Sequence, residues 1–179
     1  MYQQGFSLLE LLMGLAIAAI VLPWAGTSCK ELIESMQRED TAHLLLSGLR
    51  SARSEAITRN RRVLIQGIDN DWGKGWRITL DNKEKTLLME RSAHARVIGN
   101  STVKRRVRFG SQGEALHLNG SFQAGTLHVC AKREPVSHHQ VILAPSGRVR
   151  LESIEAEQAL CAKGLKAGSG RAVPSASKT

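Results

Sequence analysis

The sequence has few aromatic residues and few cysteines. Aromatic residues make up 4% of its 179 residues, and only Trp72, Trp76, Phe109 and Phe122 lie beyond residue 27, so a core there must consist mainly of Leu, Ile and Val. Three cysteines are too few for a disulfide-rich miniprotein. With 42% hydrophobic and 23% charged residues, the chain as a whole is neither disordered nor a polytopic membrane protein.

Signals of catalysis and of metal binding are also lacking. The six histidines form neither an HExxH motif nor a Cys/His metal spacing. Ser146 lacks the GxSxG context of a hydrolase nucleophile, and no glycine cluster carries the lysine of a P-loop. The adjacent His138 and His139 are interpreted as part of a solvated loop. The sequence therefore predicts no catalytic residue, no metal and no cofactor.

The N-terminus differs from the rest of the chain in charge and hydropathy. The first 27 residues contain no Lys or Arg and one charged residue, Glu10, which leaves a net charge of +10 for the remainder. Phe6 to Gly26 forms an apolar run of 21 residues, long enough to cross roughly 30 Å of hydrocarbon. A secretory signal peptide would need a basic start, and an ordinary membrane anchor would leave the Glu10 carboxylate unpaired in lipid. Glu10 thus requires a partner.

The run Gly5-Phe6-Ser7-Leu8-Leu9-Glu10, followed by apolar residues, resembles the class III signal of type IV pilins and type II secretion pseudopilins. The resemblance implies a leader over residues 1–5, cleaved by prepilin peptidase between Gly5 and Phe6, and methylation of Phe6. It also implies a partner for Glu10, whose carboxylate would pair with the amine of Phe6 on a neighbouring subunit in low dielectric.

The N-terminal helix is expected to continue from Phe6 to about Arg59. Residues 6–27 would form its transmembrane half and residues 28–60 its periplasmic half. Pro23 and Gly26 predict a kink or local melting. Beyond the membrane, apolar residues recur at steps of three and four. These positions are Leu32, Ile33, Met36, His43, Leu44, Leu49, Ala52, Ala56 and Ile57.

From residue 61 the hydrophobic period changes to two, which predicts a β-rich domain over residues 61–161. Short strands are expected at residues 63–68, 76–80, 86–89, 107–109, 116–118, 126–129 and 141–143, with Pro145-Ser146-Gly147 turning a hairpin into residues 148–151. The predicted fold class is α+β, with a long N-terminal helix packed on an antiparallel sheet. Residues 162–179 are small, polar and basic, which predicts a flexible tail.

Cys130 and Cys161 lie in the exported part and can close a loop of about 30 residues. In the periplasm they would be oxidised to a disulfide, for which the chain-entropy relation gives roughly 3–4 kcal/mol. Cys29 has no evident partner: it is either an inert helix residue or a site of intersubunit pairing.

Basic residues gather in three places: residues 59–62, residues 104–108 and residues 147–150. On a strand, Lys104, Arg106 and Arg108 would share one face, as would Arg148 and Arg150, roughly 6.5–7 Å apart. Arginines at this spacing can grip successive phosphates of a nucleic acid strand, or can simply form a solvated face. Because no aromatic residue stands between the arginines, base stacking is not expected to dominate.

The whole chain resembles the GspH/FimT group of minor pilins and pseudopilins. In FimT-type minor pilins a glycine-arginine-x-arginine motif binds DNA for natural transformation, and here it maps onto Gly147, Arg148 and Arg150. The resemblance implies a minor type IV pilin of the inner membrane with a periplasmic domain, assembled into a surface pilus. Its partners would be DNA, other pilins, prepilin peptidase and the inner membrane.

Three alternatives stay open. One is a structural minor pilin that primes pilus assembly, and another is a GspH-type pseudopilin of a type II secretion system, neither binding DNA specifically through this motif. The third is a membrane-anchored receptor unconnected with filaments, which would keep Met1 as its first residue.

Overall fold

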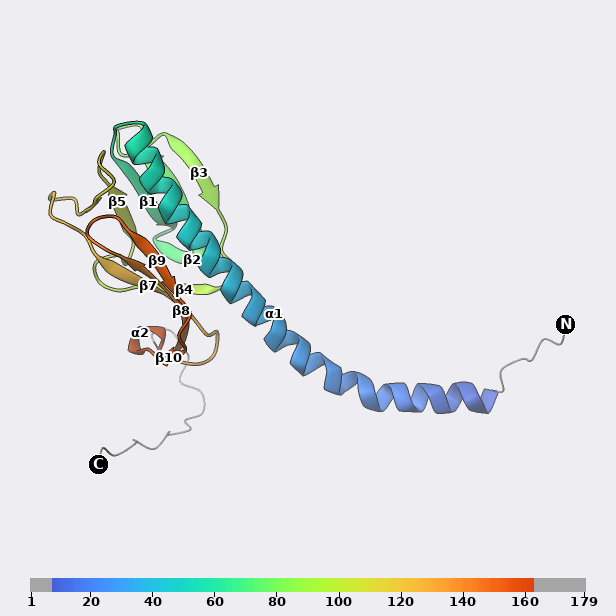
Figure 1. Ribbon diagram of the computed structural model, residues 1–179. Coiled ribbons are helices and arrows are strands. Elements are labelled where there is room, and N and C mark those ends of the chain that lie inside the picture. Colours follow the sequence, from blue (N-terminus) through green and yellow to red (C-terminus); the bar gives the residue numbers. More distant parts are fainter. Residues whose placement is uncertain (1–7, 163–179) are drawn as a thin grey trace, which may run out of the picture. The chain divides into compact units, whose positions relative to one another are not determined.

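The computed structural model describes residues 8–162, with the exception of the side chains of residue 18 and residues 20–28 (Figure 1). The expected leader 1–5, its cleavage point between Gly5 and Phe6, and the expected tail from residue 163 onward lie outside the described residues. The chain forms two units, residues 1–37 and residues 38–179.

The first element is a helix of 51 residues, α1 (Leu8–Thr58), close to the predicted extent. Its helical backbone is not interrupted at Pro23 or Gly26, so the local melting predicted there is absent. Within the described residues, no helix combines the length and the hydropathy that a membrane span requires.

Within the second unit, one face of α1 is fully buried. Its side chains recur at alternating steps of three and four residues, which places them on one stripe of the helix. They are Ala42, Leu45, Leu49, Ala52 and Ala56, each 0% exposed. The prediction of a buried face is therefore confirmed for Leu49, Ala52 and Ala56, whereas Leu32, Ile33, Met36, His43 and Ile57 are exposed.

The first sheet has five strands, all paired antiparallel, in the order β3-β2-β1-β5-β6. They are β1 (Val63–Ile68), β2 (Asp71–Leu80), β3 (Leu87–Arg91), β5 (Arg106–Phe109) and β6 (Ala115–Leu116). In the central pair, Val63 lies opposite Phe109 and Ile65 opposite Val107, and these four side chains are all buried in the core. The alternation of the strands turns Arg106 and Arg108 to the other face of this sheet.

The second sheet follows the order β10-β8-β7-β4, and β9 also pairs with β8. Its strands are β4 (Arg96–Gly99), β7 (Gly125–Cys130), β8 (Val136–Leu143), β9 (Val149–Glu152) and β10 (Ala156–Glu157), and the short helix α2 (Ala159–Ala162) follows. Core side chains from both sheets and from α1 join in one cluster, which includes Leu49, Ile65 and Val141.

The predicted α+β fold is confirmed, with the sheet part divided into two sheets and with two additional strands, β4 and β10. The prediction of a loop at His138 and His139 is wrong, because both lie within β8, where His139 pairs with Val129 of β7 and His138 lies at a shift in the register. The predicted disulfide is confirmed: Cys130 at the end of β7 is bonded to Cys161 in α2, with Cα atoms 5.6 Å apart. Cys29 is free and exposed.

Candidate nucleic-acid interface

The predicted hairpin between β8 and β9 carries the glycine-arginine-x-arginine segment. Leu143 pairs with Val149, and the loop between them closes through two backbone hydrogen bonds, Gly147 N to Ala144 O and Ala144 N to Arg148 O, each 2.9 Å. Gly147 has a φ of +77°, which makes the loop a tight turn that ends in a left-handed residue. Pro145 inside the loop and glycine at position 147 suit this turn geometry.

Gly147 is also a point of contact between the two sheets. A Cβ on Gly147 would lie 1.7 Å from the carbonyl oxygen of Gly113, in the connection between β5 and β6. Arg53 of α1 completes the contact, since its Nε donates to Gly113 O over 2.9 Å and its Nη2 donates to Ser146 O over 3.4 Å. The helix and both sheets thus hold the hairpin in place.

Arg148 and Arg150 are exposed while Val149 between them is buried, so the two arginines share the outer face of the hairpin, as predicted from the alternation. Arg50 of α1 approaches the same place, with Nη2 3.5 Å from Val149 O. Arg50, Arg53 and Arg148 line one hollow with Gly147 and Val149. We call the four residues Arg50, Arg53, Arg148 and Arg150 the α1–β9 arginine face.

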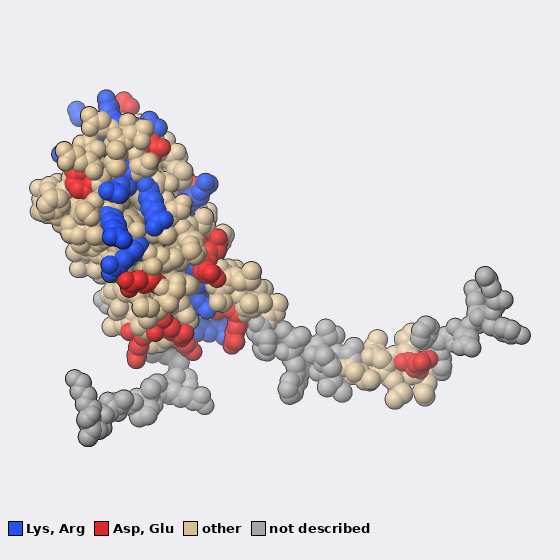
Figure 2. All heavy atoms as spheres, viewed as in Figure 1, with Lys and Arg blue, Asp and Glu red and all other residues tan. Residues whose placement is uncertain are grey.

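Figure 2 shows this gathering of basic side chains over α1 and β9, with acidic side chains toward the lower edge of the domain. One acidic residue adjoins this face: Glu152 Oε1 lies 3.0 Å from Arg150 Nε, and the Arg150 side chain is 60% exposed. Because an exposed pair of this kind contributes little free energy, Arg150 remains able to exchange Glu152 for another anion.

The sequence pattern did not point to Arg50 and Arg53 of α1. Their spacing of three residues was a usable signal, because it puts both on one edge of the buried stripe. The spacing does not show which other element this edge of the helix contacts.

The second predicted group is brought together in a separate hollow. Lys104 precedes β5 rather than lying in it, Arg106 is half-buried and Arg108 is 6% exposed. All three line one hollow, together with Arg105 and His117. This hollow and the one on the α1–β9 arginine face share no lining residue.

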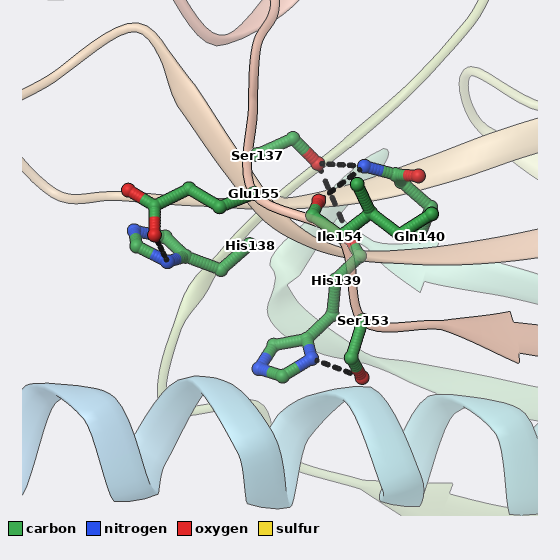
Figure 3. Close-up of polar contacts among 7 residues, drawn as sticks. All are labelled: Ser137, His138, His139, Gln140, Ser153, Ile154 and Glu155. Carbon is green, nitrogen blue, oxygen red and sulfur yellow. Dashed lines mark hydrogen bonds and ion pairs between the residues drawn. The ribbon is translucent and has the colours of Figure 1, made fainter.

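The adjacent histidines of β8 turn to different sides of the strand (Figure 3). His138 Nδ1 lies 3.8 Å from Glu155 Oε2, and His139 Nδ1 lies 2.9 Å from Ser153 Oγ. Burial lowers the pKa of His139, with Glu39 opposing the shift. Both contacts tie β8 to the segment that follows β9.

Within the described residues no group of three or more metal-binding side chains is found.

Comparison with known proteins gives two family matches. The family model described as "Type II transport protein GspH" matches residues 41–147, and the model described as "Prokaryotic N-terminal methylation motif" matches residues 1–22. The first match ends at Gly147, so it does not include Arg148 or Arg150. A search of curated proteins found no significant match.

Among solved structures, two crystal forms of the type IV minor pilin FimU of Pseudomonas aeruginosa PAO1 share the fold. One is 22% identical, with a TM-score of 0.54 over 67% of this chain and 98% of FimU. The other is 21% identical, with a TM-score of 0.55 over 71% of this chain and 98% of FimU. At this identity the likeness concerns the fold, which is a long N-terminal helix packed on antiparallel sheets.

Proposed function

The chain belongs to the GspH family, and from this membership we propose that it is a minor type IV pilin that binds DNA non-specifically and supports DNA uptake in natural transformation. The observation that carries the proposal is the α1–β9 arginine face. There Arg148, directly before β9, lines one hollow with Arg50 and Arg53 of α1, and Arg150 of β9 is exposed two residues further along. The domain as a whole has a large positive net charge.

The proposed binding is electrostatic. Guanidinium groups on neighbouring elements contact phosphates without reading base edges, so they give affinity with no sequence preference. Four phosphate contacts to a duplex would make log K fall with a slope of about −3.6 against log salt concentration. A site of this size gives weak binding, so several copies in one filament or pilus retraction would add to its effect.

Lys104, Arg106 and Arg108 form a second proposed group of phosphate contacts. Lys104 is exposed and Arg106 half-buried, so both can meet a DNA backbone at the surface. Arg108 is buried and lines the hollow.

The N-terminus supports a proposal about assembly. The methylation motif over residues 1–22 is typical of membrane-anchored pilus components. We propose that prepilin peptidase cuts between Gly5 and Phe6 and that Glu10, in the first turn of α1, then pairs with the Phe6 amine of a neighbouring pilin. The protein would be anchored in the inner membrane by residues 6–27, with its domain in the periplasm, before it enters a surface pilus.

A structural role is the second candidate, favoured by the description of the matched family as a type II transport protein. In this case the chain primes a pilus or caps a secretion pseudopilus, and it binds DNA no better than any domain of equal charge. The family and fold are those of filament components, and we propose no enzymatic activity.

The test is a gel shift with full-length protein in neutral detergent, measured over a salt titration. Arg148→Gln with Arg150→Gln is expected to remove most of the shift. The matched control, Arg77→Gln with Arg91→Gln on β2 and β3, removes the same charge from exposed arginines of the other sheet. An equal loss in both double variants would leave only the structural role.

The assembly proposal has its own test. Mass spectrometry of the filament protein is expected to find methylated Phe6 as the first residue, and Glu10→Ala is expected to be processed but left out of filaments. A mature chain that begins at Met1 would support a receptor unconnected with filaments.

A further inference from the structure

The hollow beside β5 is lined largely by cationic side chains. It has a volume of about 280 Å³ and is lined by Lys104, Arg105, Arg106 and Arg108 together with His117 and apolar side chains. Its deepest cation is Arg108, whose side chain is 7% exposed. Burial of a guanidinium costs free energy unless an anion pairs with it. The partner of the Arg108 guanidinium therefore bears on what the hollow can bind.

Arg108 is incompletely paired. Asp81 Oδ2 lies 3.4 Å from Nε, yet this buried Nε makes no hydrogen bond within the described part of the chain. The single carboxylate at that distance is opposed by four cationic side chains in and around the hollow. An incoming phosphate would reduce this excess of positive charge.

An exposed aromatic side chain lies in the same row of the sheet. Arg108 pairs with Leu116 of β6, and Leu116 forms a bridge to Phe122. Directly opposed residues of antiparallel strands point to the same face, so Arg108, Leu116 and Phe122 are successive neighbours across it. Two strand spacings place the backbone of Phe122 roughly 10 Å from that of Arg108.

The Phe122 ring is presented to solvent on an ordered loop. Its residue is 68% exposed, although phenylalanine is usually buried. The next residue, Gln123, is 3% exposed and donates from Nε2 to the carbonyl oxygens of Thr102 and Arg106, over 2.7 and 3.0 Å. The loop is closed by hydrogen bonds of 2.8 Å from His117 N to Ser121 O and from Gln123 N to Ala115 O. The backbone at Phe122 is therefore held next to the basic hollow, which Gln123 helps to line.

From this juxtaposition we infer that the β5–β6 hollow binds single-stranded DNA, with a phosphate among Lys104, Arg106 and Arg108 and an unpaired base stacked on Phe122. Base stacking on an exposed aromatic beside a basic groove is how proteins bind single strands without reading their sequence. A duplex keeps its bases stacked on one another and offers no free base face to Phe122. The inference rests on the proposed function, since it takes DNA as the partner, and it adds a strand preference.

The experiment compares a fluorescent oligothymidine with a duplex of equal length, using full-length protein in neutral detergent. Phe122→Ala is expected to weaken single-strand binding about tenfold, because one stacked base is worth roughly that factor, and to leave duplex binding unchanged. Phe122→Trp keeps an aromatic face and is expected to restore single-strand binding. Ile154→Ala is the matched control, because Ile154 is 59% exposed and lies outside the hollow.

A second variant tests the phosphate contact without disturbing a buried group. Arg106→Gln is expected to lower single-strand affinity more than Arg91→Gln does. Melting followed by circular dichroism is expected to show all of these variants folded, because the substituted side chains are exposed or half-buried.

The possible failures can be separated. A wild type that binds neither DNA overturns the proposed function and this inference together. Duplex binding that depends on Arg148 and Arg150, combined with single-strand binding that Phe122→Ala leaves unchanged, overturns this inference alone. An equal loss of single-strand and duplex binding in Phe122→Ala also overturns it, since it removes the strand preference.

Discussion

Arg53 donates from Nε to the carbonyl oxygen of Gly113 over 2.9 Å, at the point where the β8–β9 hairpin meets the loop between β5 and β6. Both loops place a left-handed glycine there, with φ of +84° at Gly113 and +77° at Gly147. The absence of a side chain on Gly147 lets the Gly113 carbonyl approach, and this approach holds the hairpin arginines against α1. The position of the α1–β9 arginine face thus depends on backbone packing.

Gly147→Ala is expected to lower the free energy of unfolding by about 2 kcal/mol or more. The new Cβ would meet Gly113 O in a backbone conformation that L-residues rarely adopt. Urea unfolding followed by tryptophan fluorescence measures the change. Gly120→Ala is the control, because Gly120 also has a positive φ, of +86°, but nothing lies within 4 Å of its Cβ position. An equal cost in both variants would contradict a role of the Gly113 contact.

Glu152→Gln is expected to tighten duplex binding about two- to fivefold at low salt. The substitution frees Arg150 from an exposed ion pair and removes one negative charge from the arginine face. Fluorescence anisotropy with a labelled duplex measures it. Glu134→Gln, an exposed change of equal charge in the turn between β7 and β8, is expected to have a smaller effect. If the two variants bind equally, net charge rather than Arg150 determines the affinity.

Reduction of the Cys130–Cys161 disulfide is expected to cost about 3–4 kcal/mol of stability, since it frees a loop of 31 residues in the unfolded chain. Urea unfolding with and without dithiothreitol measures the loss. Below the unfolding transition, reduced protein should still bind DNA, because β7, β9 and α1 hold the hairpin independently of α2. Cys29→Ser changes an exposed free thiol and is expected to leave both measurements unaltered.

Stability is expected to fall as the pH drops below about 6.5, in part through His128. Burial lowers the pKa of His128 in the folded protein, where Nδ1 lies 3.2 Å from Ser137 Oγ and Nε2 lies 3.5 Å from Gln158 Nε2. The Gln158 amide nitrogen is a donor only, so its contact with Nε2 opposes protonation of the ring at that atom. Below its ordinary pKa of about 6.5 the unfolded chain binds more protons than the folded one, which favours unfolding.

The check is the urea midpoint of wild type and His128→Gln at pH 7.5 and 5.5. The variant is expected to lose less stability between these values. Burial lowers the pKa of His139 as well, so some dependence on pH should remain. A variant with the same loss as wild type would show that His128 does not contribute.

Local patterns were sufficient to predict most elements of the fold. The change to a hydrophobic period of two predicted the strands β1 and β7, and the run Pro145-Ser146-Gly147 predicted the hairpin. Steps of three and four residues predicted the buried face of α1. The pattern failed at His138 and His139, because two polar side chains in the middle of a strand carry no period-two signal. Pairing with β7 and contacts to the segment after β9 determine their conformation.

By itself, the sequence determined the features that depend on neighbouring residues: the helix, the strands, the turn before Arg148 and the alternation that exposes Arg148 and Arg150. Only the tertiary structure decided which distant residues join them. It brought Arg53 to the hairpin, buried Arg108 and set Phe122 in its row, although Phe122 is separated from Arg108 by a turn and a further strand. The reason is that strand register and helix docking are set by the shared core, whose members come from all parts of residues 42–149.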